Sequence, residues 1–480
     1  MHGKELSSVQ QRHLETLITR YNKRTKTSKQ LTQAHRPVLA DIRASEGFGL
    51  LIKEMLYPIV GKRSLGSRIW DVDGNEYVDL MMGFGVNLFG HNPPFIKTAL
   101  EEQLEKGIQL GPRSELAGEV AELICELTRM ERVTFSNTGT EAVMTAIRLA
   151  RTVTERNKIA LFSGSYHGHF DGTLVKAQTT DGNPQAVPIA PGVPPNIAED
   201  VLVLDYANPQ SLEVIKAYEQ ELAAVLVVPV QTDRPDLQPK TFLQQLRQLT
   251  KELGITLIFD EMVTGFRIHP GGAQAWFGVE ADIATYGKIV GGGMPIGIIG
   301  GKGVYMDAID GGMWNYADSS YPQAKTTFFA GTFCKHPLTM AAALAVLKNL
   351  KIQGPTLQQQ LNQRTSQFVE ALNAYFEEDE VPVRMAHFGS LFGPASSGNP
   401  ASAGNSAVSQ SMELLRYHLF DRGVHLLGGG GYLSTAHTEE DIDYIIQAVK
   451  DSVAELREGG FLPALSSNSP NATLALSDSK

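Results

Sequence analysis

Short apolar runs alternate with helix-length amphipathic stretches through the middle of the chain, between about residues 106 and 350. The apolar runs are Val133–Phe135, Ile159–Phe162, Val201–Leu204, Ala224–Val228 and Thr256–Phe259. Strands that alternate with helices in this way are typical of βαβ units, in which consecutive strands lie parallel. We therefore predict an α/β fold whose large domain, residues 106–350, contains a mostly parallel sheet.

The patterns on either side of this region differ. Residues 68–79 alternate apolar and polar positions around Asp73-Gly74-Asn75, which predicts an antiparallel hairpin. Helical patterns follow at 337–352, 357–376 and 439–457. We predict a smaller α+β domain built from both chain ends, residues 46–105 and 351–462, with an N-terminal helix and extended linker over 1–45 and a disordered tail over 463–480.

Composition narrows the class of protein. The chain has 480 residues, is 42% hydrophobic and 20% charged, and carries a net charge of -10, which argues against a nucleic-acid partner. No run of about 18 apolar residues predicts a membrane span. The two cysteines, Cys125 and Cys334, indicate neither a disulfide framework nor a thiolate metal site. We expect a cytoplasmic protein.

Lys288 is the first candidate for chemistry. It precedes a glycine-rich run, and its neighbours Ile283, Ile289 and Val290 have the character of buried residues. Asp260 ends an earlier apolar run. This pair suits pyridoxal phosphate, which needs an amine for its aldehyde and a carboxylate that keeps its ring nitrogen protonated. A buried structural ion pair explains the two residues equally well at this point.

Two segments could bind a phosphate. Ser136–Ala142 follows a predicted strand and opens a predicted helix, so that Gly139 and Thr140 can donate hydrogen bonds to an anion. The alternative is a helix cap formed by Thr138 or Thr140, and both interpretations can hold together. Thr332, in a second Gly-Thr pair, has the same two interpretations.

The segment Ser163–His169 places Tyr166 and His167 at the end of another predicted strand, where an aromatic ring could stack. His167 and His169 are spaced as a metal pair might be, but no carboxylate or cysteine lies at ligand spacing. We therefore predict no metal.

Six motifs in order resemble the class III pyridoxal-phosphate aminotransferases, especially glutamate-1-semialdehyde aminomutase. They lie at 74–79, 138–142, 166–168, 259–267, 287–293 and 331–333, and the likeness covers about residues 46–460. Four further segments, at 82–91, 236–239, 268–277 and 433–437, are similar to aminotransferase domains of hybrid polyketide synthase and nonribosomal peptide synthetase assembly lines. The resemblance implies the type I fold of pyridoxal-phosphate-dependent transferases.

The resemblance also implies roles for single residues. Lys288 would bind the cofactor covalently and carry the proton, and Asp260 would hold the ring-nitrogen proton. Tyr166, with His167 beside it, would stack on one ring face and Met262 on the other. The phosphate would be held by residues of two subunits of a homodimer, namely Gly139 and Thr140 of one and Thr332 of its partner.

The implied reaction moves an amine from an amino-acid donor through pyridoxamine phosphate to a keto group. In the assembly-line relatives the acceptor is a β-ketoacyl thioester on an acyl carrier protein, and the product is a β-aminoacyl thioester. Two alternatives stay open: an aminomutase of the glutamate-1-semialdehyde type, and a degenerate domain used for docking or dimerisation.

The chain departs from the family at two places. The family usually has Glu-Pro-Val where this chain has Val228-Pro229-Val230, and residues 426–432 lack the arginine that often binds donor carboxylates. Losing both partners avoids leaving one buried charge unpaired. The glycines at 428–431 predict a mobile loop.

Overall fold

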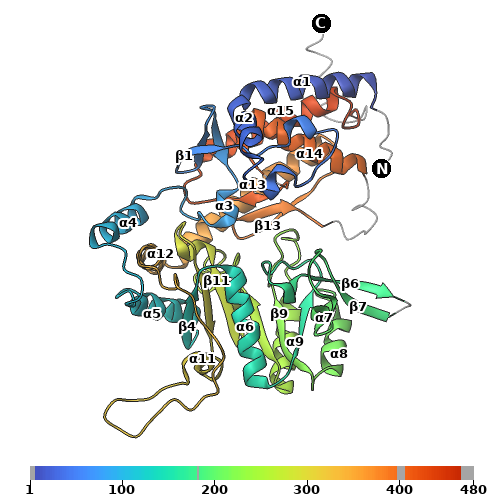
Figure 1. The fold of residues 1–480 in the computed structure, drawn as a ribbon. Helices are drawn as coiled ribbons and strands as arrows, with labels where there is room; N and C mark the ends of the chain where they lie inside the picture. The colour runs from blue at the N-terminus through green and yellow to red at the C-terminus, as the bar shows by residue number, and fades with distance from the viewer. Residues whose placement is uncertain (1–5, 181–182, 397–405, 427, 466–480) are drawn as a thin grey trace. The chain divides into compact units, whose positions relative to one another are not determined.

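The computed structural model describes residues 6–180, 183–396, 406–426 and 428–465 (Figure 1). The chain forms two compact units. The larger unit contains Pro94–Thr232 and Leu237–Asn362, and the smaller contains Met1–Pro93, Asp233–Asp236 and Gln363–Lys480. The predicted disorder of the last residues lies outside the described residues, from 466 onward, and stays a prediction.

A seven-stranded sheet forms the centre of the larger unit, in the order β4-β12-β11-β10-β9-β5-β8. Its strands are β4 (Arg132–Ser136), β5 (Lys158–Phe162), β8 (Val201–Leu204), β9 (Leu222–Val227), β10 (Thr256–Asp260), β11 (Ile283–Gly287) and β12 (Gly297–Gly301). All run parallel except β12, which pairs antiparallel with both β4 and β11. The predicted α/β class with a mostly parallel sheet is confirmed.

Helices connect the strands of this sheet, and α6 runs along one face of it (Figure 1). The α-helices of the larger unit are α4 (Pro94–Lys106), α5 (Ala117–Thr128), α6 (Gly139–Thr154), α7 (Pro195–Ala198), α8 (Pro209–Ala217), α9 (Lys240–Leu253), α10 (Gly272–Phe277), α11 (Gly303–Asp310) and α12 (Pro337–Gln353). Short 3-10 helices lie at Asp171–Thr173 and Lys288–Gly291, and a hairpin is formed by β6 (Val175–Thr180) and β7 (Asn183–Pro188).

The smaller unit has two sheets. The first, β1-β2-β3-β15, contains the predicted hairpin as β2 (Arg68–Asp71) and β3 (Glu76–Asp79). Its other strands are β1 (Gly61–Leu65) and β15 (Val424–His425), and β15 pairs parallel with β3 although it comes from the other end of the chain. The second sheet is antiparallel and consists of β13 (Met385–Phe388), β14 (Leu391–Pro394) and β16 (Gly431–Tyr432).

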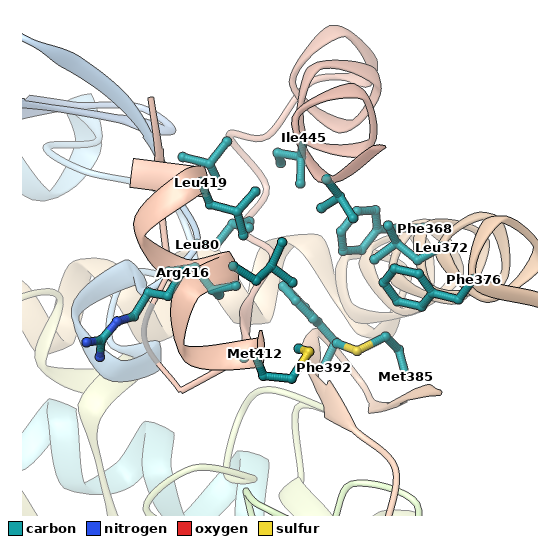
Figure 2. A pocket seen from close by; sticks show the side chains of 15 residues that line it. Leu80, Phe368, Leu372, Phe376, Met385, Phe392, Met412, Arg416, Leu419 and Ile445 are labelled. Atoms are coloured by element: carbon teal, nitrogen blue, oxygen red, sulfur yellow. The ribbon is translucent and has the colours of Figure 1, made fainter. Parts of the chain in front are cut away.

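Helices of the smaller unit pack around an apolar core. They are α1 (Ser8–Arg24), α2 (Lys26–His35), α3 (Met82–Gly85), α14 (Ser406–Asp421) and α15 (Glu439–Glu458), with short 3-10 helices at Ile42–Ala44 and Lys53–Met55. Helix α13 (Pro355–Glu378) contributes residues to both units. Figure 2 shows Phe368 and Phe376 of α13, Leu419 of α14 and Ile445 of α15 around a small apolar cavity, from which Arg416 points away.

The N-terminal region contains two helices. Helix α1 begins with a capping box between Ser7 and Gln10, and α2 follows it directly. Among the described residues, none of the helices is both long and apolar enough to cross a membrane.

Candidate active site

Asp260 is the last residue of β10 and is buried at the carboxyl edge of the parallel strands. Its Oδ2 lies 2.8 Å from Nδ1 of His167. Its Oδ1 accepts hydrogen bonds from the Met262 N–H and the Thr285 hydroxyl, both at 3.2 Å. Three donors from three segments therefore hold the carboxylate in one orientation.

His167 belongs to the turn that follows β5. Because a carboxylate only accepts hydrogen bonds, Nδ1 of His167 is the donor in this contact, and the other ring nitrogen is Nε2. This Nε2 is buried and has no hydrogen-bond partner among the described residues. Tyr166, by contrast, is 74% exposed. The turn thus presents one exposed aromatic ring and one imidazole fixed on a carboxylate.

Lys288 follows β11 directly and opens a 3-10 helix. Its φ of 48° lies in the left-handed region, a conformation that side chains rarely adopt and that is enriched at functional sites. Burial lowers the pKa of the Lys288 amine, and the positive charge of Arg267 lowers it further, while the negative charge of Asp260 opposes the shift. A lowered pKa favours the neutral amine, which is the form that attacks a carbonyl.

Met262 connects the segments around Lys288 and α6. A Cβ atom at Gly139 would lie 3.0 Å from the Met262 sulfur, and one at Gly287 would lie 2.8 Å from it. Glycine at both positions therefore lets the Met262 side chain lie between the start of α6 and the residue that precedes Lys288. This places Met262 among the predicted cofactor-binding residues.

The N-terminus of α6 has both features that the sequence predicts, a helix cap and N–H groups that can bind an anion. Thr138 caps the helix, with its hydroxyl accepting from the Glu141 N–H at 3.1 Å. Gly139 and Thr140 are the first helical residues, whose N–H groups have no partner within a helix and suit an anion. The Thr140 hydroxyl accepts from the His169 N–H at 3.2 Å, so its own proton is available to donate.

Thr332 is exposed and lies in the loop before α12. That helix is capped by His336, so the capping interpretation of Thr332 is wrong. Two residues on, the Cys334 sulfur lies 3.9 Å from Nδ2 of Asn137, which precedes the cap of α6. The predicted role of Thr332 in the partner subunit's site stays a prediction.

Two buried charged residues near the site were not predicted to have a role. Glu261 accepts hydrogen bonds from the N–H groups of Ala273 at 2.6 Å and Gln274 at 3.1 Å and from the Thr264 hydroxyl at 3.0 Å. Burial raises the pKa of Glu261 to about 7 against these donors. Arg267 is the largest fully buried side chain among the residues that the structure describes. The sequence signal for both was a charge inside a largely apolar run.

These residues fit pyridoxal phosphate. The cofactor needs an amine with a lowered pKa, an anionic partner for its ring nitrogen and N–H donors for its phosphate. Lys288, Asp260 and the start of α6 supply them within one unit of the fold. Among the described residues, no three His, Cys, Asp or Glu side chains are grouped so as to hold a metal ion.

Comparisons with known proteins agree with this chemistry. A family model described as aminotransferase class-III matches residues 52–430. A glutamate-1-semialdehyde 2,1-aminomutase of Chloroflexus aggregans is 34% identical over 456 residues, which cover 92% of this chain and 100% of that relative.

Solved structures are similar over nearly the whole chain. A β-phenylalanine aminotransferase from Variovorax paradoxus has a TM-score of 0.80 and 28% identity, covering 95% of this chain and 100% of that one. A structure described as a transaminase with PLP bound has a TM-score of 0.78 and 28% identity, covering 91% of this chain and 99% of that one.

Proposed function

Because the chain belongs to the class III aminotransferases, we propose that it transfers an amine from an amino-acid donor to a β-ketoacyl thioester on an acyl carrier protein. The family confirms the predicted enzyme class, the type I fold and the cofactor, pyridoxal phosphate. The acceptor, the carrier protein and the roles of single residues belong to the proposal.

Pyridoxal phosphate supplies, when bound, an aldehyde for amines and a ring that withdraws electrons from the substrate carbon. Lys288 Nζ would hold the cofactor through its aldehyde and would move a proton at the substrate carbon. Asp260 would keep the ring nitrogen protonated, and His167 orients Asp260. A protonated ring stabilises negative charge at the reacting carbon.

The remaining predicted residues bind and orient. Gly139 and Thr140 would donate to the phosphate at the start of α6, and Thr332 of a second copy would complete the phosphate site in a homodimer. Tyr166 and Met262 would cover the two faces of the ring. Because Tyr166 is exposed, its ring is available to stack on a planar ligand.

The observation that carries the choice of acceptor is the apolar side chain at the end of β9. Val228 is half-buried there, where the family usually has a glutamate, and no arginine occurs between residues 426 and 432. A second carboxylate on the substrate would therefore lack the family's usual partners. An acyl chain needs none, and the similar Variovorax enzyme is named for a β-amino acid.

The relatives support a second candidate, an aminomutase of the glutamate-1-semialdehyde type. Proteins with that name are 34% and 36% identical to this chain over most of its length. Such an enzyme would move an amine within glutamate 1-semialdehyde without any separate donor. The absence of an acidic side chain at Val228 favours the transferase.

Intact-protein mass spectrometry separates the two candidates. Carrier proteins loaded with β-ketoacyl chains are incubated with the enzyme, pyridoxal phosphate and a panel of amino acids. We expect the mass of the loaded carrier protein to change by the amount that corresponds to replacing the keto oxygen with an amine. This change should occur only when both the amino donor and the enzyme are present. If no acceptor changes mass while glutamate 1-semialdehyde is isomerised without a donor, the aminomutase is the correct function.

A further inference from the structure

Helices α1 and α2 carry a concentrated positive charge. Between Glu15 and Asp41 the chain has six lysines and arginines and no acidic residue, although the net charge of the whole chain is -10. The two helices, in blue in Figure 1, belong to the smaller unit and precede the residues that match the aminotransferase family model. This charge therefore lies outside the part of the chain that the family model describes.

Half of these six side chains have partners within the smaller unit. Arg20 pairs with Asp421 and Glu455, Lys29 pairs with Glu54, and the Arg24 guanidinium lies over the ring of Tyr77. The other three, Lys23, Lys26 and Arg36, are exposed and form no ion pair with any residue that the structure describes. Their positive charges are therefore available to another molecule.

Helix α2 presents its basic residues together on one side. The buried residue of the helix is Ser28, whose N–H and hydroxyl donate to Asp73 at 3.0 and 3.2 Å. A helix turns by about 100° per residue, so Lys26, Lys29 and Arg36 lie within about 80° of one another around its axis. Ser28 lies outside that arc. The residue that attaches the helix and the basic residues are therefore on different sides of it.

Lys26 occupies a position that does not favour a cation. It is the first residue of α2, where the helix dipole has its positive end. The Asp73 carboxylate satisfies this end by accepting from the N–H groups of Thr27 at 2.6 Å and Ser28 at 3.0 Å. The charge of Lys26 therefore adds nothing to the stability of the helix, and its exposed amine faces solvent.

We propose that Lys23, Lys26 and Arg36 form a docking surface for an acidic face of the acyl carrier protein. This inference rests on the proposed function, because it takes a carrier-bound thioester as the substrate. An acidic partner is repelled by a chain with a net charge of -10 and attracted where positive charge is concentrated. Complementary charges of this kind mainly raise the rate of encounter, which suits a carrier that must leave after each transfer.

The test compares one β-ketoacyl chain on two supports, the carrier protein and free pantetheine. In the triple variant Lys23→Glu, Lys26→Glu and Arg36→Glu, we expect kcat/KM for the carrier-bound chain to fall about 10-fold, because three attractive charges become repulsive. For the pantetheine thioester, which brings no protein to dock, kcat/KM should be unchanged. Raising NaCl from about 0.05 M to about 0.5 M should bring the wild type and the variant together with the carrier substrate, because salt screens exposed charges.

The triple variant Lys176→Glu, Lys216→Glu and Lys251→Glu is the matched control. These lysines are exposed in the larger unit and likewise form no ion pair within the described part of the chain. The control has the same net charge as the test variant, and we expect it to keep the wild-type kcat/KM with both substrates. Unfolding midpoints of both proteins show whether they are folded. Lys26→Glu alone should raise the midpoint, because it places a negative charge in the first turn of α2.

The inference is overturned if the test variant converts the carrier-bound chain as the wild type does, or if the control variant loses as much activity, since net charge alone would then set the rate. An equal loss with the carrier and pantetheine substrates also overturns it, because the substitutions would then impair the enzyme and not docking. A wild-type protein that converts neither substrate would instead contradict the proposed function.

Discussion

Nδ1 of His167 lies 2.8 Å from Oδ2 of Asp260, and both side chains are buried. The contact joins the turn after β5 to the end of β10, across the intervening strand β9. The imidazole that donates here fixes the orientation of the Asp260 carboxylate. The carboxylate is then held ready for a cationic partner such as a protonated ring nitrogen.

We expect Asp260→Asn to impair chemistry far more than cofactor binding. The amide cannot stabilise a protonated ring nitrogen, and its NH₂ group competes with the proton on His167. Since one lost electrostatic contact to the transition state costs roughly 100- to 1,000-fold in kcat, we expect a loss of that size. The measurement is the rate per bound cofactor, with cofactor content determined by absorbance.

Asp282→Asn provides the matched control for this change. Asp282 is also buried, but it precedes β11 at the opposite edge of the sheet, where it accepts from the Leu257 N–H at 2.9 Å and pairs with Arg247. We expect it to lower the free energy of unfolding and to leave the rate per bound cofactor unchanged. Equal losses of rate in both variants would contradict the assignment of Asp260.

Lys288→Met should abolish covalent cofactor binding and yet stabilise the cofactor-free protein. Burial and the charge of Arg267 lower the pKa of the Lys288 amine, so protonating it disfavours the folded state. The penalty is complete below the lowered pKa and fades as pH rises through that pKa toward the ordinary lysine value. The stability gain of the variant should therefore be largest at neutral pH and shrink in alkali, as measured by urea unfolding.

Lys302→Met serves as the control for Lys288. This lysine pairs with Asp282 at 2.6 Å and is partly exposed at the end of β12. We expect it to bind cofactor covalently as the wild type does. If Lys288→Met keeps the absorbance of the lysine-bound cofactor, another residue holds the aldehyde.

The sequence predicted the strands that have a clear apolar pattern. Residues 159–162 and 256–259 lie in β5 and β10, and Asp260 ends β10 as expected from its place after the run. Strand β12, Gly297–Gly301, was not predicted, because three of its five residues are glycine and its pairing is antiparallel. Its burial comes from close backbone packing, which a pattern of large apolar side chains does not reveal.

The contacts between the residues of the site were harder to predict than which residues belong to it. The sequence placed His167 beside Tyr166 but gave no sign that it donates to Asp260, 93 positions away. Gln231 donates to the carbonyl of Ser163, 68 positions away, although its segment appeared notable only for Val228. Motifs identify residue types at strand ends, whereas the order of strands in the sheet decides which of them meet.

Val228→Glu tests the apolar character of the substrate site. The new carboxylate would be half-buried at the end of β9. Burying an unpaired charge is unfavourable, so we expect kcat/KM for a β-ketoacyl thioester to fall by at least about 10-fold while cofactor content is unchanged. Val228→Thr, which keeps the shape without a charge, should retain most of the activity. A more active glutamate variant would contradict the proposed acceptor.

A pair of histidines in the smaller unit predicts acid-sensitive packing of the N-terminal helix. Nε2 of His13 on α1 lies 3.0 Å from Nε2 of His418 on α14, and Nδ1 of His418 lies 2.7 Å from Glu455 on α15. Only one proton fits between the two facing nitrogens. Burial lowers the pKa of His418 to about 3 and lowers that of His13, although Glu455 opposes both shifts. The other charged groups around the pair are Arg20, Asp421, Arg422 and Glu458.

His418 is therefore neutral in the folded protein down to about pH 3, whereas an unfolded histidine takes up a proton below about pH 6.5. Above about pH 6.5, His418 is neutral in both states and does not reduce the free energy of unfolding. As the pH falls from 6.5 toward 3, only the unfolded state takes up the proton, so the free energy of unfolding falls by up to about 1.4 kcal/mol per pH unit. We expect the free energy of unfolding, measured in urea from pH 7.5 to 4.5, to fall less steeply in His418→Phe than in the wild type. His35→Gln, at the exposed end of α2, should follow the wild-type curve. Parallel curves for His418→Phe and the wild type would show that the buried pair does not set the acid sensitivity.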